Sequence, residues 1–426
     1  MAEAVEERPA AGRTARGIVG WCLYDWANSA FNTVIGTFVF SVYFARGIYG
    51  DETAGSALWA LVIGLSGIAV AVASPVLGAI ADQAGRRKPW IGLFVAVTAA
   101  ATALLWFAEP DRAFVAYALV LVAIASIAFE LANVFYNAML PSVAPAGFAG
   151  RVSGWGWGLG YIGGLACLVL ALVAFVQPER PWFGVGTENA ANIRATSLLV
   201  AAWFVAFALP MFALTGDTPA SGRGLRTAAR DGLAQLWQTI VHVRRYGQIV
   251  RFLIASALYR DGLSTLFAVG GLYAAGTFGM SFEQILVFAI GLNVTAGLGA
   301  GLFSFVDDML GSRRTALLGL AGLLALGIPV LLIADARLFI GLALGLGLFV
   351  GPVQAASRTL MARLAPPAMA TEMFGLYAFT GKSIAWLGPL AFAALTEAFD
   401  SQRAGMASIV VLLAAGGALL LTVRAP

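Results

Sequence analysis

Apolar segments long enough to cross a bilayer recur along the whole chain, with short polar turns between them. A helix needs roughly 20 apolar residues to span the hydrocarbon core. On that scale the pattern predicts twelve transmembrane helices. Six lie near residues 20–46, 57–81, 90–108, 113–140, 152–176 and 195–214. Six more lie near residues 250–275, 283–305, 315–334, 336–358, 373–396 and 404–423.

The polar stretches divide the chain into four parts. Residues 1–17 are rich in Ala, Glu and Arg, and we expect them to be a disordered cytoplasmic segment. Residues 18–214 and 250–426 are the predicted six-helix bundles. Residues 215–249 form the longest polar stretch and link the bundles. Five apolar residues of this linker have helical spacing and predict an amphipathic helix on the membrane surface: Leu233, Leu236, Trp237, Ile240 and Val241.

The two halves of the chain resemble each other. A single offset aligns four pairs of residues, namely Asp82 with Asp308, Gly85 with Gly311, Arg87 with Arg313, and Lys88 with Arg314. Parallel six-helix repeats joined by a linker are the plan of one large class of transporters. The predicted fold class is therefore an all-α polytopic membrane protein built from two parallel six-helix bundles.

Polar stripes run along two of the predicted spans. Residues three or four apart share one face of a helix, and this spacing holds for two sets: Asp25, Asn28, Ser29 and Asn32, and Ser126, Glu130, Asn133 and Asn137. A charge at bilayer depth is costly and usually faces a polar cavity. We therefore expect a water-filled path between these two helix faces. The alternative is a buried network of ion pairs and hydrogen bonds between helices.

Two further charges, Asp261 and Lys382, fall inside predicted spans. At a rise of about 1.5 Å per residue, both could meet Asp25 and Glu130 in one central layer. Asp261 adjoins Arg260, so a local ion pair is the alternative for that residue. Lys382 is either a counter-ion in the layer or a side chain that extends to the interface.

The basic residues sort by membrane side. Of the 26 Lys and Arg residues, eighteen fall on one side of the predicted topology and six on the other, with Arg260 and Lys382 inside spans. The positive-inside rule therefore places both termini in the cytoplasm. With 60% hydrophobic and 11% charged residues, the chain is lipid-embedded. Its net charge of +4 does not form a single patch for nucleic acid.

The chain offers little for catalysis or cofactor binding. Its cysteines, Cys22 and Cys167, and its single histidine, His242, form no metal motif. No Walker sequence is present to bind ATP. We therefore expect no metal, no cofactor and no enzymatic activity.

The loop Gly78-Ala-Ile-Ala-Asp82-Gln-Ala-Gly85-Arg86-Arg87-Lys88 is the most specific short motif. It resembles the gating loop between helices 2 and 3 of the major facilitator superfamily. Its partial copy ends the corresponding helix of the second half and contains Asp308, Gly311, Arg313 and Arg314, with Ser304 in place of the leading glycine. The resemblance implies that both loops take part in gating.

Three further segments resemble the vacuole-effluxer branch of that superfamily, typified by autophagy-related vacuolar proteins of fungi. They begin at Trp21-Cys-Leu-Tyr24-Asp25-Trp26, at Phe135-Tyr136-Asn137 and at Val152-Ser153-Gly154. The resemblance implies the major facilitator fold and a transport role, and fungal members are associated with amino-acid efflux. In this superfamily helices 1, 4, 7 and 10 face the cavity; these helices carry Asp25, Glu130, Asp261 and Gln354.

We therefore expect a monomeric secondary transporter that moves a small polar solute, with an amino acid as the candidate, by alternating access. The carboxylates would either exchange coupling protons or bind the solute directly in an uncoupled facilitator. In a bacterium the protein would lie in the inner membrane. The remaining alternative is a membrane sensor or scaffold that keeps the fold without transporting a solute.

Overall fold

The computed structural model describes residues 14–424. Within this range the secondary structure is helical throughout, and twelve helical segments are long and apolar enough to cross a membrane. This confirms the predicted fold class. The expected disorder of residues 1–17 falls mostly on residues 1–13, which lie outside the described residues. The first helix already begins at Ala15.

The first bundle contains six spans. The first span joins α1 (Ala15–Ala30), the wider π-helical turns η1 (Phe31–Phe38) and η2 (Phe44–Ile48), and the short α2 (Phe40–Tyr43) between them. The next five spans contain α3 (Glu52–Ala84), α4 (Lys88–Leu104), α5 (Val115–Ala138) followed by α6 (Leu140–Val143), α7 (Ala149–Ala171) and α8 (Ala191–Leu214).

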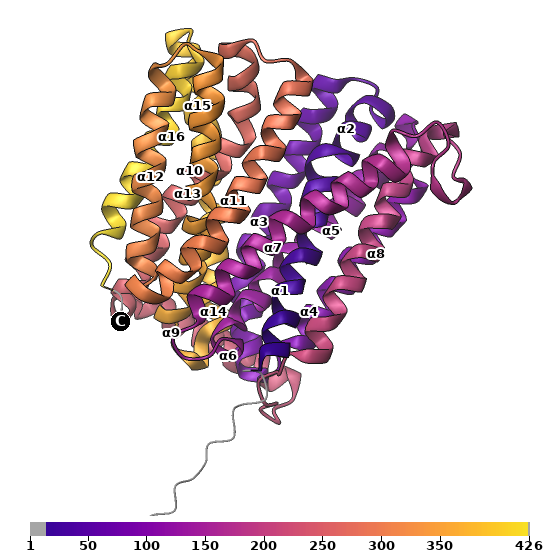
Figure 1. The fold of residues 1–426 in the computed structure, drawn as a ribbon. Coiled ribbons are helices and arrows are strands. Elements are labelled where there is room, and N and C mark those ends of the chain that lie inside the picture. The colour runs from indigo at the N-terminus through magenta and orange to yellow at the C-terminus, as the bar shows by residue number, and fades with distance from the viewer. Residues whose placement is uncertain (1–13, 425–426) are drawn as a thin grey trace, which may run out of the picture.

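The second bundle repeats this order. Its spans contain α10 (Gly247–Phe278), α11 (Phe282–Leu310), α12 (Ser312–Leu332), α13 (Ala336–Leu364), α14 (Ala370–Ile384) followed by α15 (Leu387–Phe399), and α16 (Gln402–Leu420). Figure 1 shows the indigo-to-magenta first bundle beside the orange-to-yellow second bundle. The beginning of α1, the end of α16 and α9 (Leu225–Val241) lie at one end of the molecule. We call this end the linker face and the opposite end the far face.

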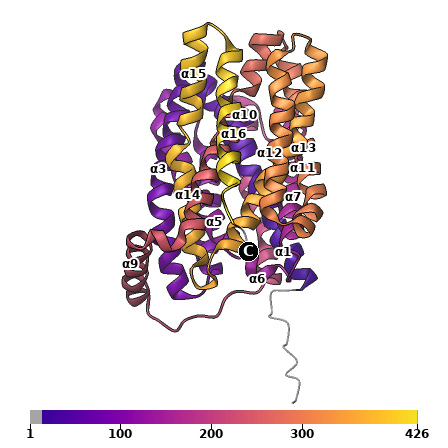
Figure 2. The ribbon, with the colours of Figure 1, turned by 90° about the vertical axis from the view of Figure 1, so that its left-hand side faces the viewer.

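The helix α9 packs beside the last turns of α3 (Figure 2). A Cβ atom on Gly232 would lie 2.8 Å from the backbone of Ala79, so the two helices are in close contact. Of the five apolar residues that predicted an amphipathic helix, Leu236 is buried against the protein. The other four are exposed: Leu233, Trp237, Ile240 and Val241.

The eleventh span, predicted as one helix, is broken between α14 and α15. Pro389 stands in the first turn of α15 and has no N–H to donate to the carbonyl of Ala385. Its ring would also clash with that carbonyl in a continuous helix. The break is therefore encoded by the dipeptide Gly388-Pro389. It begins at Ala385, three residues after Lys382.

Candidate functional site

A cavity of about 700 Å³ lies between the two bundles. Its wall contains eight of the nine residues predicted to form the solute or proton path: Asp25, Asn28, Asn32, Glu130, Asn133, Asn137, Gln354 and Lys382. They come from the first, fourth, tenth and eleventh spans. The helical stripes read from the sequence thus face one another across a common space.

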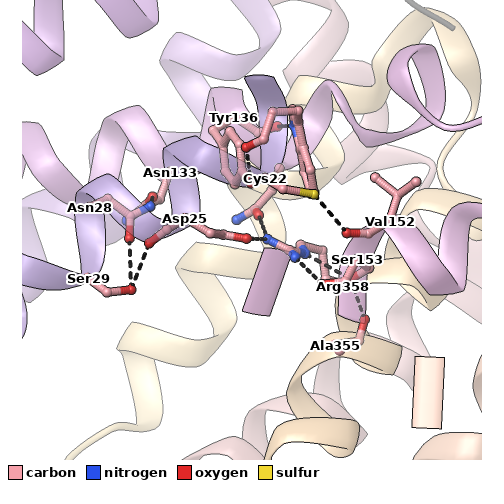
Figure 3. Close-up of polar contacts among 12 residues, drawn as sticks. Cys22, Asp25, Asn28, Ser29, Asn133, Tyr136, Val152, Ser153, Ala355 and Arg358 are labelled. Carbon is pink, nitrogen blue, oxygen red and sulfur yellow. Dashed lines mark hydrogen bonds and ion pairs between the residues drawn. The ribbon is translucent and has the colours of Figure 1, made fainter. Parts of the chain in front are cut away.

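Asp25 forms a buried ion pair with Arg358 of α13, at 2.8 Å between Oδ2 and Nη1 (Figure 3). Arg358 also donates to Oδ1 of Asn137 at 3.3 Å and to the carbonyl oxygen of Ser153 at 2.6 Å. Its guanidinium lies over the ring of Trp21, 4.7 Å from the centroid. This pair joins the two bundles at the end of the cavity nearer the linker face.

Arg358 is a site residue that the sequence pattern does not predict. The predicted tenth span ends at residue 358, which groups this arginine with the basic residues of the cytoplasmic side. The structure corrects that assignment, because α13 continues to Leu364 and Arg358 is only 4% exposed. Helical side chains tilt toward the N-terminal end of their helix, which here directs Arg358 into the bundle. The signal was the apolar run Leu360-Met361-Ala362, which follows Arg358 and continues the helix past the predicted end of the span.

Glu130 of α5 and Lys382 of α14 form a second pair across the cavity, at 2.6 Å between Oε1 and Nζ. The side chains of both are 32% exposed, so this pair faces the cavity more openly than Asp25 and Arg358 do. Of the two readings for Lys382, the structure shows the counter-ion, and its partner is Glu130.

Amide and hydroxyl groups complete the wall. Asn28 donates to Oδ1 of Asn133 at 3.0 Å, which joins the first and fourth spans. Tyr161 of α7 donates to Oε1 of Gln354 at 2.5 Å, which joins the two bundles. These groups give the cavity hydrogen-bonding capacity without further charge.

The position of Asp261 differs from the expectation. It is 2% exposed and does not line the cavity, and among the described residues it does not pair with Arg260. Its Oδ2 instead accepts from the backbone N–H of Gly388 at 2.7 Å. Consecutive helical residues point about 100° apart, so the two neighbours face different surroundings. Arg260 is the one at the cavity, where it lies over the ring of Tyr377.

The loop from Gly78 to Lys88 joins the two bundles at the linker face. Asp82 accepts from the backbone N–H groups of Thr371 and Glu372, at 3.1 and 2.8 Å, at the beginning of α14. Arg87 reaches Asp82 at 3.4 Å and donates to Oγ1 of Thr371 at 2.9 Å. A Cβ atom on Gly78 would lie 2.5 Å from the carbonyl oxygen of Thr371, so the glycine allows this close approach.

The other residues of this loop hold neighbouring segments in place. Gly85 ends α3 at a φ of +93°, where a glycine is favoured. Lys88 donates to the carbonyl oxygens of Phe212 and Thr215 at the end of α8. Arg86 is exposed.

The second loop makes the matching contact. Asp308 accepts from the backbone N–H groups of Gly150 and Arg151, at 2.8 and 3.2 Å, at the beginning of α7. It also pairs with the side chain of Arg151 at 2.9 Å and with that of Arg363 at 3.6 Å. Each bundle therefore caps a helix of the other, despite the missing glycine in the second copy.

The flanking residues of the second loop act within their own bundle or point outward. Gly311 has a φ of +88°, and Arg313 donates to the carbonyl oxygens of Leu420 and Leu421. Arg314 is exposed.

Comparison with known proteins shows which family this chain resembles. The family described as "Vacuole effluxer Atg22 like" matches residues 145–426, and the Major Facilitator Superfamily matches residues 6–168. A Bacillus subtilis protein named as the uncharacterized MFS-type transporter YxiO is 28% identical over 94% of this chain and 93% of its own. Autophagy-related protein 22-2 of Emericella nidulans is 28% identical over 62% of this chain and 49% of its own. The chain thus spans about half of that fungal relative.

Solved structures share the fold at low sequence identity. The human organic anion transporter MFSD10 superposes with a TM-score of 0.71 at 16% identity, covering 97% of this chain and 100% of its own. The E. coli fucose:proton symporter FucP also gives a TM-score of 0.71, at 12% identity, covering 96% and 98%. Superfamily members are transporters rather than enzymes, in agreement with the expectation from the sequence. The chain belongs to the Atg22-like vacuole effluxer family, a branch of the major facilitator superfamily of membrane transporters.

Proposed function

We propose that this transporter moves a small zwitterionic solute, of the amino-acid class, by alternating access about the central cavity. The observation that carries the proposal is the pair of Glu130 and Lys382. One bundle supplies the anion and the other supplies the cation, 2.6 Å apart and both facing the cavity. A solute with an ammonium and a carboxylate group could replace this pair with two of its own.

Such a replacement would connect solute binding to movement of the bundles. A solute held by Glu130 on α5 and Lys382 on α14 contacts both bundles at once, whereas a solute held by one charge contacts only one. Charge-assisted hydrogen bonds contribute about 1.5–3 kcal/mol each. Neighbouring amides at Asn28 and Asn133 add hydrogen-bonding groups to the same wall.

The contacts between the bundles support an alternating gate. Asp82 and Asp308 hold the linker face closed. The pair of Asp25 and Arg358 closes the end of the cavity nearer the linker face. From there the cavity wall continues through Thr37 to Phe339, toward the far face. We therefore propose that this conformation admits solute from the far face, and that rocking of the bundles exposes the cavity to the linker face.

The proposed orientation follows from the charge distribution. The linker face carries most of the arginines, so we assign it to the cytoplasm, with both termini on that side. The family description names efflux from a vacuole, which is movement toward the cytoplasm, and this agrees with solute entering from the far face. We further propose a proton as the coupling ion and a monomer as the transporting unit.

Counterflow in proteoliposomes tests the proposal. Vesicles preloaded with one unlabelled amino acid at a time would be diluted into its radiolabelled form. We expect exchange of at least one amino acid by the parent protein. Glu130→Gln and Lys382→Gln should each raise the amino-acid concentration that gives half-maximal exchange by about tenfold or more. This change corresponds to the loss of one charge-assisted hydrogen bond.

Arg180→Gln serves as the control, because this residue lies in an exposed loop of the far face and should leave exchange unchanged. The absence of exchange across the whole panel, with folded protein in the vesicles, would contradict an amino-acid substrate. Unaltered exchange by both cavity variants would contradict the assigned site.

A further inference from the structure

Asp261 differs from the two acids that line the cavity, Asp25 and Glu130. Asp25 pairs with Arg358 and Glu130 pairs with Lys382. Within residues 14–424, Asp261 has no cationic partner, and its Oδ1 is buried without any hydrogen-bond partner. The Oγ1 of Thr265, one helical turn away on α10, is also buried and unpartnered. Both side chains lie against Gly388 of α15.

The nearby cationic side chains bond to other groups. On the same helix, Arg260 donates to the carbonyl oxygen of Tyr377. On the helices packed against α10, Arg358 pairs with Asp25, Lys382 pairs with Glu130, and Arg403 donates to the carbonyl oxygen of Ile333. An isolated buried carboxylate costs several kcal/mol. A positive charge from outside the protein would remove that cost.

The contact that Asp261 makes connects its charge to the stability of the first turn of α15. Gly388 is the second residue of α15, and the residue before this helix, Trp386, provides no side-chain cap. Asp261 supplies the missing cap from another helix, through the 2.7 Å bond to the N–H of Gly388. A carboxylate at a helix N-terminus is favoured in its ionised form. Burial and the helix end therefore favour opposite protonation states.

We propose that Asp261 binds the coupling proton of the transport cycle and that its protonation loosens the cap on α15, changing the geometry of the break in the eleventh span. The inference rests on the proposed function, because it names the coupling site of that transporter. The proton binds to the unpartnered Oδ1 and is released again when the carboxylate recaps Gly388. Among residues 14–424, two unpartnered oxygens meet here, those of Asp261 and Thr265, whereas a metal cation such as calcium takes six or more oxygen ligands.

The position of the break connects this site to the cavity. Lys382 lies three residues before Ala385, on the last turns of α14, and pairs with Glu130 of the other bundle. A change in the angle between α14 and α15 therefore acts on the segment that carries Lys382. In this way a proton behind the cavity wall can alter the affinity for a solute inside the cavity.

Asp261→Asn tests the inference in the whole protein, reconstituted in proteoliposomes. The amide oxygen of asparagine can still accept from Gly388 but cannot exchange a proton. We expect counterflow within about twofold of the parent and loss of accumulation driven by a pH gradient. Asp261→Glu should restore part of that accumulation. Glu397→Gln, which removes an exposed acid on α15, should accumulate solute as the parent does.

The outcomes separate the two proposals. Absence of counterflow in the parent contradicts the proposed function. Counterflow in the parent, with full pH-driven accumulation by Asp261→Asn, overturns only the role of Asp261. Accumulation that is driven by a sodium gradient and does not depend on a pH gradient would show that the ligand of Asp261 is not a proton.

A second measurement covers the case in which Asp261→Asn does not fold. Hydrogen exchange of the parent in detergent micelles, corrected for the intrinsic effect of pH, should show weaker protection at residues 386–390 in acid than at neutral pH. Protection there that does not change with pH would overturn the inference.

Discussion

At the residue scale, the two ion pairs of the cavity differ in burial, and we therefore expect them to have different roles. Asp25 and Arg358 are enclosed, with side chains 13% and 4% exposed, whereas Glu130 and Lys382 are each 32% exposed. Removing one partner of a buried pair leaves an uncompensated charge and costs about 3–5 kcal/mol. A more exposed pair contributes at most about 1 kcal/mol. The first pair should therefore act mainly in stability and the second mainly in binding.

Thermal unfolding of detergent-solubilised variants checks this difference. Asp25→Asn should destabilise the protein by about 3–5 kcal/mol, and Glu130→Gln by about 1 kcal/mol or less. Combining Asp25→Asn with Arg358→Gln should recover part of the loss, because the orphaned guanidinium is then also removed. Equal destabilisation by the two single variants would mean that burial does not distinguish the pairs.

The same residues show which parts of the site can be predicted from the sequence. Helical spacing correctly grouped Asn28 with Asp25 and Asn133 with Glu130, because the period of a helix fixes which residues share a face. It could not say which neighbour each face meets. Asp261 was therefore expected at the cavity, whereas its carboxylate lies against α15. Arg358 was missed because a polar residue near a helix end looks like the edge of the membrane.

At the scale of elements, the twelve spans could be read from the sequence because each is a long apolar run. The interruption of the eleventh span was not predicted, although Gly388-Pro389 encodes it locally. The π-helical turns of the first span were also not predicted, since one extra residue per turn leaves no mark in an apolar segment. These irregular turns border the cavity at Asn32, Thr33 and Thr37.

We propose that the helix α9 contacts lipid. Its exposed apolar residues face away from the protein, and Arg226 and Arg230 continue that face. Gly232 packs against Ala79, five residues before the end of α3. At the rise of an α-helix this is roughly 7–8 Å inside the end of the span. That depth matches the boundary between headgroups and acyl chains, where amphipathic helices lie.

A fluorophore that responds to polarity can report this contact. Attached at Ile240→Cys it should shift to shorter wavelength in nanodiscs rich in anionic lipid, whereas at Gln238→Cys it should not. Replacing Arg226 and Arg230 with glutamine should weaken the dependence on anionic lipid, since each basic residue near such a surface contributes about 1 kcal/mol. The same emission at both positions would place α9 away from the bilayer.

At the scale of the whole molecule, the two bundles hold each other through reciprocal caps. Asp82 of the first bundle caps α14 of the second, and Asp308 of the second caps α7 of the first. The internal repeat predicted that the two loops are equivalent, but not that each would bind a helix end of the opposite bundle. Because both caps lie at the linker face, breaking one of them should favour opening at that face.

Distances between spin labels test this rocking motion most directly. Ala146→Cys with Met309→Cys reports on the linker face, and Thr53→Cys with Arg337→Cys reports on the far face. The native cysteines, Cys22 and Cys167, are buried. Introducing Asp82→Asn should lengthen the linker-face distance and shorten the far-face distance, while the protein stays folded. Unchanged distances, or changes of the same sign at both faces, would contradict alternating access about the central cavity.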